Sequence, residues 1–290
     1  MQGGAVAFLN RDTSKAVEEY CHAVQLAEAH SLGDECLAGS IERLVHARRT
    51  AQPESDVSGL QQRATELRTR LTLETDRRLA ETVAAKGSQH PDVAECLSRC
   101  AFQSLVIGDA EKAIALHKQA LSIRRNAFGE LHFEVANTLT IIAGVYSLRL
   151  RNEEAAAALC EQAVAILEKL YEALDASDSS SKNIAMSLKG NLENLATDAF
   201  RRGDFNRAEQ IYRRIMEILV QTCEPGQCQL PCNAPIFVKV LIHQRKFDEA
   251  ESILEMARKR GLLEKGYLAP KYQEALAELY QATGQAPAAQ

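Results

Sequence analysis

The stretch His90-Pro91-Asp92-Val93-Ala94 returns as His132-Phe133-Glu134-Val135-Ala136, 42 residues further along the 290-residue chain. A similar polar segment follows each copy at the same offset, Gly108-Asp109-Ala110-Glu111-Lys112-Ala113 after the first and Leu150-Arg151-Asn152-Glu153-Glu154-Ala155 after the second. Similarity at a fixed period is the signature of a repeat architecture. The 42-residue period therefore predicts consecutive copies of one structural unit, with one extra loop residue in the second copy.

The same polar segment occurs twice more, as Gly203-Asp204-Phe205-Asn206-Arg207-Ala208 and as Arg245-Lys246-Phe247-Asp248-Glu249-Ala250, again 42 residues apart. Between Ala155 and Ala208 the spacing is 53 residues. The surplus coincides with the run Asp175 to Ser181, which is polar and rich in serine, as connecting loops are. We expect this run to be a flexible loop inserted between two repeats.

Each polar segment has the residues of a turn between two helices. Gly108 and Gly203 can adopt the left-handed conformation that ends a helix, and Asp109, Asn152 and Asp204 can cap the next helix. A small residue follows each cap by a few positions, where it would let two helices approach closely; these residues are Ala16, Ala113, Ala155, Ala208 and Ala250. The repeat is therefore predicted to be a helix hairpin, in which larger residues at these alanines would overpack.

The composition favours helices throughout. Hydrophobic residues make up 46% of the chain and charged residues 25%, with only 15 Gly and 7 Pro, so the chain is predicted to fold. Apolar residues recur at helical spacing, for example from Leu188 to Ala199 and from Ile211 to Leu219. A single hairpin cannot cover its own apolar face, so neighbouring hairpins must stack. The predicted fold class is all-α, a superhelical solenoid of stacked antiparallel helix hairpins.

Charge and hydropathy exclude several classes of partner. A net charge of -5 with a pI near 5.9 argues against nucleic acid, which requires a clustered excess of Lys and Arg. No apolar stretch is long enough to span a bilayer, and the first ten residues do not look like a signal peptide, so the expected compartment is the cytoplasm. The eight Cys residues are then expected to be free thiols.

The sequence Gln119-Ala120-Leu121-Ser122-Ile123-Arg124-Arg125-Asn126-Ala127-Phe128-Gly129-Glu130-Leu131-His132 resembles part of a tetratricopeptide repeat of the 42-residue kinesin light chain kind. Leu192-Glu193-Asn194-Leu195-Ala196 and Arg202-Gly203-Asp204-Phe205-Asn206-Arg207-Ala208-Glu209 are similar to the two helices of the same family. The resemblance implies a right-handed superhelix that binds peptides or other proteins. A HEAT-type array of similar period is the alternative, and the Gly-Asp turns favour the tetratricopeptide repeat.

The repeats suggest a division of the chain into four parts. Residues 1–86 are expected to hold N-terminal hairpins, one shortened and one divergent, with a long charged helix from about Asp56 to Ala85. Residues 87–173 hold two clear repeats and residues 174–182 the Ser/Asp-rich loop. Residues 183–290 hold two further repeats and a C-terminal capping helix.

By analogy with other solenoids, partner-binding residues should lie on the first helix of each hairpin, facing a concave groove. Asn194 stands where the family often places an Asn that can hydrogen-bond a peptide backbone, although the matching residues elsewhere are Arg99 and Ile141. The predicted groove residues are Glu95, Ser98, Phe102, Asn137, Thr140, Glu193, Asn194, Thr197, Arg201, Lys239 and His243. A peptide and a helical segment of another protein both remain possible ligands.

No catalytic motif is present: the chain has no phosphate-binding loop, no nucleophile elbow and no His-Glu-x-x-His pair, so we expect neither an enzyme nor a cofactor. Cys223, Cys228 and Cys232 lie close together, but zinc needs four ligands, and His243 is on a different predicted segment. A Pro-rich loop without metal is favoured there. Cys96 and Cys100 share a helix face and are expected to pack in the core.

The sequence therefore predicts a non-enzymatic scaffold or adaptor that binds another protein in a concave groove. The alternative is a structural subunit of a larger assembly, which would pack through its convex faces and its long charged helix. Homo-oligomers are possible under either hypothesis. A third, weaker hypothesis is a metal-regulated switch or enzyme built on the loop with three Cys residues.

Overall fold

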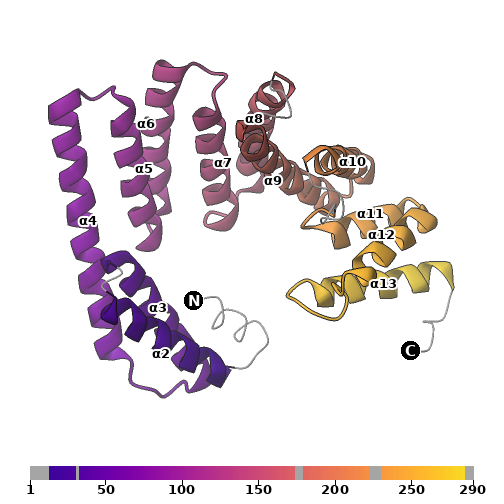
Figure 1. Cartoon of the computed structure of the whole chain (residues 1–290), viewed down its shortest axis with the longest axis horizontal. Coiled ribbons are helices and arrows are strands. Elements are labelled where there is room, and N and C mark those ends of the chain that lie inside the picture. The colour runs from indigo at the N-terminus through magenta and orange to yellow at the C-terminus, as the bar shows by residue number, and fades with distance from the viewer. Residues whose placement is uncertain (1–12, 31–32, 174–178, 223–229, 285–290) are drawn as a thin grey trace. The chain divides into compact units, whose positions relative to one another are not determined.

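The computed structural model describes residues 13–30, 33–173, 179–222 and 230–284, and within these residues every regular element is a helix. The first helices are α2 (Thr13–Ala29), α3 (Asp34–Ala51), α4 (Ser58–Lys86) and α5 (Pro91–Val106). They are followed by α6 (Ala110–Phe128), α7 (Phe133–Leu148), α8 (Glu153–Glu172), α9 (Ser179–Arg201), α10 (Phe205–Thr222), α11 (Ala234–His243), α12 (Phe247–Lys259) and α13 (Ala269–Thr283). Consecutive helices form antiparallel hairpins (Figure 1). The predicted all-α class of stacked hairpins is confirmed.

The chain divides into two compact units, Met1–Gln119 and Ala120–Gln290, and the division falls inside α6. In the first unit α3 packs against α2 and α4, and α4 packs against α5. The core of this unit includes Tyr20, Ile41, Leu44 and Leu67, which lie at helical spacing on their helices. The expected long charged helix is present as α4, and the sequence boundaries at 86/87 and 173/174 stay predictions.

In the second unit each helix packs against the next, from α7 through α12, and α13 covers α11 and α12. Leu139, Leu167, Leu188 and Ile215 are almost completely buried, one in each of four successive helices. Each of these helices thus buries one apolar stripe against its neighbours, as the helical periodicity predicts. The result is a continuous core along the stack of hairpins.

The repeated turn has the predicted geometry where it contains glycine. Gly108 and Gly203 have φ angles of 92° and 78°. The carboxylates of Asp109 and Asp204 accept hydrogen bonds from the backbone N–H groups of Lys112 (2.9 Å) and Arg207 (3.0 Å). The glycine ends one helix and the aspartate caps the next, so the chain reverses within a few residues.

Two of the four turns use arginine in place of glycine. Arg151 and Arg245 have φ angles of 54° and 58°, and Asn152 caps α8 by accepting from the N–H of Ala155 at 3.0 Å. A side chain in this conformation costs about 1–2 kcal/mol, which the stacked hairpins on either side must offset. The left-handed residue before Asn152 is therefore Arg151, whereas the sequence alignment placed Leu150 opposite Gly108.

This shift corrects one predicted contact residue. The small residue with full burial lies four positions after the cap, as at Ala113, Ala208 and Ala250. In α8 that position is Ala156, which is 6% exposed, and not Ala155, which is only half-buried. The extra loop residue between the two copies lies before the cap, in the turn that contains Arg151.

A second correction concerns the predicted loop at 174–182. Residues 174–178 lie outside the described part of the chain, but α9 begins at Ser179, so residues 179–182 are helical. Ser181 is buried on the same face as Ile184 and Leu188, which continue its stripe at helical spacing. Serine is common at the start of helices. Because apolar residues at helical spacing follow it, the end of the polar run forms the first turn of α9.

The hairpins of the second unit are also joined by buried charge. Glu209 in α10 pairs with Arg213 at 2.7 Å and with Lys246 at the start of α12, and its side chain is only 11% exposed. Burial alone would raise the pKa of this carboxyl group, but the hydrogen bonds from Lys246 and Arg213 outweigh burial and lower it. A lowered pKa means that the folded chain favours the ionised form of Glu209.

The pH dependence follows from that direction. The contribution of Glu209 is present above the ordinary glutamate pKa and is lost as the pH falls toward and below the lowered value. We expect Glu209→Gln to reduce the free energy of unfolding by about 1–3 kcal/mol at pH 7 and by much less at pH 3. Urea unfolding at both pH values measures this, with the exposed Glu251→Gln as control; an equal loss at both pH values would contradict the assignment.

Candidate functional site

A cavity of about 340 Å³ opens in the second unit between α7, α8 and α9. Three of the predicted groove residues line it, Asn194, Thr197 and Arg201, all from α9. They follow one another at helical spacing, so they share one face of that helix. The opposite wall is formed by α7 through Gly144, Ser147 and Leu148.

The wall contributed by α7 has an exposed leucine and an open glycine on either side of Ser147. Leu148 is 71% exposed, and nothing lies within 4 Å of the place where a Cβ atom of Gly144 would be. Leu148 and Gly144 continue the helical stripe of Asn137 and Ile141, of which only Asn137 was predicted from the sequence. The helical spacing from Asn137 could have identified Gly144 and Leu148. They were not predicted because nearly all of the predicted groove residues are polar, and these two are not.

Asn194 lies at the surface of this cavity, with the thiol of Cys160 from α8 behind it. Its amide is exposed, whereas Cys160 is buried among apolar neighbours that include Leu195. Burial raises the pKa of Cys160 to about 11, partly offset by a hydrogen bond with Asn194. The thiol is therefore protonated at neutral pH, and the exposed side of the Asn194 amide can still donate and accept hydrogen bonds.

The third predicted residue, Arg201, forms an ion pair across the cavity. Its guanidinium donates two hydrogen bonds to the carboxylate of Glu153, at 3.2 and 3.3 Å, and the hydroxyl of Ser147 donates a third at 2.9 Å. These bonds, first that from Arg201 and then that from Ser147, lower the pKa of Glu153. The site therefore has an exposed leucine, an amide and a paired charge.

Thr197 and Glu193 bind the next hairpin. The hydroxyl of Thr197 accepts a hydrogen bond from the Asn233 amide at 3.3 Å. The buried carboxylate of Glu193 accepts from the backbone N–H of Cys232 at 2.7 Å and lies 3.6 Å from the ammonium of Lys189. Glu193 thus holds the start of α11 against α9 and is not open to the groove.

Thr140 joins α7 to α9 in a similar way. Its hydroxyl contacts the amide of Asn191, which is 1% exposed and donates at 2.9 Å. Asn137 is half-buried one turn earlier on α7. Further along the stack, Lys239 forms ion pairs with Glu278 at 2.7 Å and Glu274 at 3.0 Å of α13.

His243 ends α11 and stacks on Phe205, with ring centroids 4.2 Å apart and planes 9° from parallel. Phe200 completes a three-ring cluster at 6.2 Å from His243. His243 is exposed, but the cluster joins the ends of α9, α10 and α11. Among the predicted residues of the second unit, the structure therefore brings only Asn194, Thr197 and Arg201 into one cavity.

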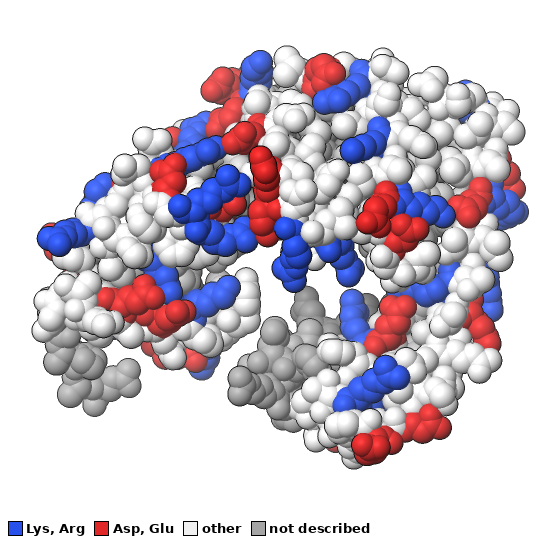
Figure 2. Space-filling model, turned by 180° about the vertical axis from the view of Figure 1, so that it is seen from behind, with Lys and Arg blue, Asp and Glu red and all other residues white. Residues whose placement is uncertain are grey.

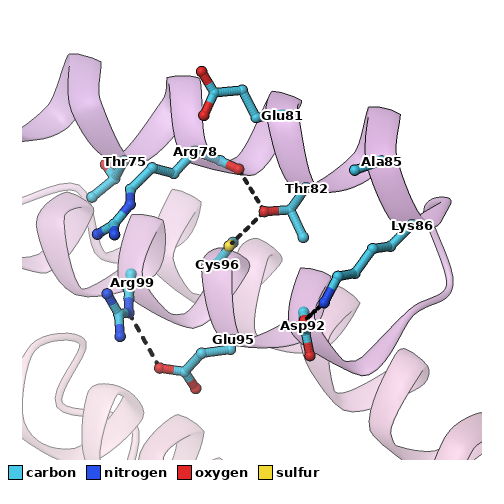
Figure 3. A pocket seen from close by; sticks show the side chains of 10 residues that line it. All are labelled: Thr75, Arg78, Glu81, Thr82, Ala85, Lys86, Asp92, Glu95, Cys96 and Arg99. Carbon is cyan, nitrogen blue, oxygen red and sulfur yellow. Dashed lines mark hydrogen bonds and ion pairs between the residues drawn. The ribbon is translucent and has the colours of Figure 1, made fainter.

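The remaining predicted residues are in the first unit, on α5. Glu95 lines a shallow cavity of about 470 Å³ between α4 and α5, and it accepts a hydrogen bond from Arg99 at 3.3 Å (Figure 3). Ser98 donates to the backbone carbonyl of Ala94 at 2.9 Å, and Phe102 is 48% exposed. Charged groups of both signs alternate along the cavity, and Lys86 pairs with Asp92 at its end.

In several places on the face drawn in Figure 2, acidic side chains lie beside basic ones, in keeping with the many Arg–Glu pairs. Within the described ranges no group of three or more His, Cys, Asp or Glu side chains is placed to hold a metal. Cys223 and Cys228 lie outside those ranges. No helix that the structure describes is both long and apolar enough to cross a bilayer.

Two tetratricopeptide repeat patterns match the chain, one at residues 105–169 and the other at residues 192–227. A search among curated proteins finds no significant match. The fold is similar to solved structures of the nearly identical TPR-like repeats of a putative kinesin light chain from Podosopora anserina. A variant form of these repeats is 18% identical, with 77% of this chain and 93% of that chain covered and a TM-score of 0.51.

A second structure of the Podosopora anserina repeats is 18% identical over 78% of this chain and 96% of that one, with a TM-score of 0.49. BtubC (BKLC) from P. vanneervenii is also 18% identical over 97% and 95% of the two chains, with a TM-score of 0.40.

Stacked hairpins with this turn define the class of superhelical helix-hairpin solenoids. Within that class, tetratricopeptide repeats match at residues 105–169 and 192–227, and the fold is similar to that of TPR-like repeats from a putative kinesin light chain. Such repeats build protein–protein interaction scaffolds, and they are generally not enzymes. The alternative of a structural subunit that packs through α4 stays a prediction.

Proposed function

We propose that the chain is an adaptor that binds a peptide or helical segment of another protein in the groove between α7 and α9. The observation that carries the proposal is the cavity of about 340 Å³ that combines Asn194, Thr197 and Arg201 with the exposed Leu148. An apolar surface beside a few oriented polar groups is the usual composition of a ligand-binding pocket. The apolar wall supplies affinity, and the amide and the ion pair supply orientation.

The cavity lies on a rigid support, which favours binding without rearrangement. Thr140 and Asn191 join α7 to α9 through a buried hydrogen bond, and Glu193 joins α9 to the segment before α11. These contacts hold α9 against α7 and against the segment before α11. A preorganised groove loses less conformational entropy when a ligand binds, so more of the contact energy appears as affinity.

The test uses peptides selected from a random phage-displayed library on the full chain. Leu148→Glu should weaken binding of the enriched peptides at least tenfold, because it places a charge on the apolar wall; tenfold corresponds to about 1.4 kcal/mol. Fluorescence polarisation with labelled peptides gives the dissociation constants. Circular dichroism checks that the variant remains helical.

Met186→Glu is the matched control. Met186 is 68% exposed on α9, in the same unit, and does not line the cavity. The same substitution there should leave the dissociation constants unchanged. If both variants weaken binding equally, or if no peptide is enriched, the proposed groove is wrong.

A further inference from the structure

A cavity of about 300 Å³ lies in the first unit, between α3, α4 and the end of α5. It shares no lining residue with the cavity of Figure 3. Half of its lining residues are aliphatic: Val45, Ala64, Val106 and Ile107. Val45 and Ala64 are buried, whereas Ile107 is 57% exposed. The aliphatic part of the cavity can therefore be reached from solvent at the end of α5.

The polar half of the lining carries no net charge. Nε and Nη2 of Arg68 donate to the two carboxylate oxygens of Glu42, both at 2.8 Å. The other two polar residues, Gln61 and Thr65, already make hydrogen bonds within the unit. The amide oxygen of Gln61 accepts from Arg49 at 2.9 Å, and the hydroxyl of Thr65 donates to the backbone carbonyl of Gln61 at 2.9 Å.

One donor of this cavity has no acceptor. The side chain of Arg68 is only 10% exposed, and its Nη1 is buried with no hydrogen-bond partner among the residues that the structure describes. A buried donor without an acceptor costs free energy, and more so when it belongs to a charged group. Native proteins keep few such donors, so each one indicates a strained or functional position. Because Arg68 lines the cavity, an acceptor that enters the cavity lies next to this guanidinium.

The repeat pattern gives an independent reason to single out this place. The residue that directly follows the first helix of each repeat is Ile107, Arg149, Arg202 or Gln244. Three of the four are polar, as is usual for a turn at the surface. Only the first is aliphatic, and it is the one that lines the cavity. The departure from the repeat and the unpaired donor therefore occur at the same cavity.

We propose that this cavity binds an extended, uncharged segment of a partner protein, which packs an aliphatic side chain against Ile107 and presents a backbone carbonyl oxygen to Arg68. A carboxylate is a poorer acceptor here, because Glu42 already neutralises the guanidinium and would repel a second negative charge. A helix is a poorer ligand, because its carbonyl groups accept hydrogen bonds within the helix itself. An extended segment has free carbonyl groups, so it matches both halves of the lining.

The test uses the full chain with ¹³C-labelled valine and isoleucine methyl groups and N-acetyl-leucine methylamide as the probe. This compound is neutral and carries one aliphatic side chain between two peptide carbonyls. In a titration followed by NMR it should shift the methyl signals of Val106 and Ile107. N-acetyl-leucine, which has a carboxylate in place of the second amide, should bind roughly tenfold more weakly. Equal binding of the two compounds, or no shift at Val106 and Ile107, would overturn the proposal.

Ile107→Glu is the first variant, because an exposed residue in a turn can be replaced without disturbing the core. It should weaken binding of the methylamide roughly tenfold, measured at Val106. Leu73→Glu is the matched control, since Leu73 is 66% exposed on α4 and does not line the cavity. Unchanged affinity in Ile107→Glu, or an equal loss in Leu73→Glu, would show that the cavity is not the binding site.

The second variant removes the donor. Arg68→Met combined with Glu42→Leu replaces both members of the ion pair, so no single charge is left between α3 and α4. This variant should also weaken binding of the methylamide roughly tenfold while circular dichroism stays helical. Unchanged binding would overturn the role given to Arg68. Leu148→Glu, which alters the groove between α7 and α9, should leave binding of the methylamide intact, so this site is tested separately from that groove.

Discussion

Tyr212→Ala is expected to lower the free energy of unfolding by about 3–5 kcal/mol, the usual cost of removing a buried aromatic ring. Tyr212 has no exposed surface, and its ring stacks on Phe237 with centroids 4.9 Å apart and planes 20° from parallel. This stack joins α10 to the short α11. Urea unfolding of the full chain followed by circular dichroism measures the loss.

Tyr212→Phe is the matched control, because it keeps the ring and removes only the hydroxyl. We expect it to cost much less than the alanine variant. In a repeat protein each repeat is stabilised by contacts with its neighbours, so a weakened interface can open locally. The rate of hydrogen exchange in Tyr212→Ala should therefore rise first in α11, α12 and α13. Uniform acceleration across α7 to α13, or equal losses for the two variants, would contradict the role given to the ring.

Ala208→Leu is expected to lower the free energy of unfolding by about 1–3 kcal/mol through overpacking. Ala208 is fully buried in α10, four residues after its cap, and α10 packs closely against α9. A leucine there would force the two helices apart or adopt a strained rotamer. Thermal unfolding of the variant should show the loss as a lower midpoint.

The control for this substitution is Ala158→Leu. Ala158 is exposed on α8, so the larger side chain meets solvent and should change stability by less than about 0.5 kcal/mol. A variant at Ala208 as stable as the control would show that the hairpin has room for a larger residue at its crossing. The same experiment at Ala156 and Ala155 would test the corrected register of α8, with the larger loss expected at Ala156.

The helices and turns could be predicted from the sequence because their causes are local. Periodic apolar residues, Gly108 or Gly203 at the end of one helix and Asp109 or Asp204 at the start of the next are sufficient to specify a hairpin. The turn at Arg151 was misplaced by one residue, because no glycine marks the left-handed position there. The start of α9 was missed because the polar residues before it are typical of loops as well as of helix starts.

The groove was predicted less completely, since the direction of a side chain on a helix does not reveal which neighbour it meets. Glu193, Thr140 and Lys239 were expected to face a ligand, and the structure shows each of them bound to a neighbouring segment. Their partners, Cys232, Asn191 and Glu278, are about 40 to 50 residues away in the chain. Nothing in the local pattern identifies such partners.

The sequence by itself determined the repeat, the hairpins, the caps and the buried alanines at the helix crossings, because these depend on backbone conformation and on contacts within one repeat. Only the tertiary structure decided which polar residues of the first helices are used in stacking and which remain open. The physical reason is that stacking places residues of successive repeats side by side, and the register between repeats sets every one of those contacts.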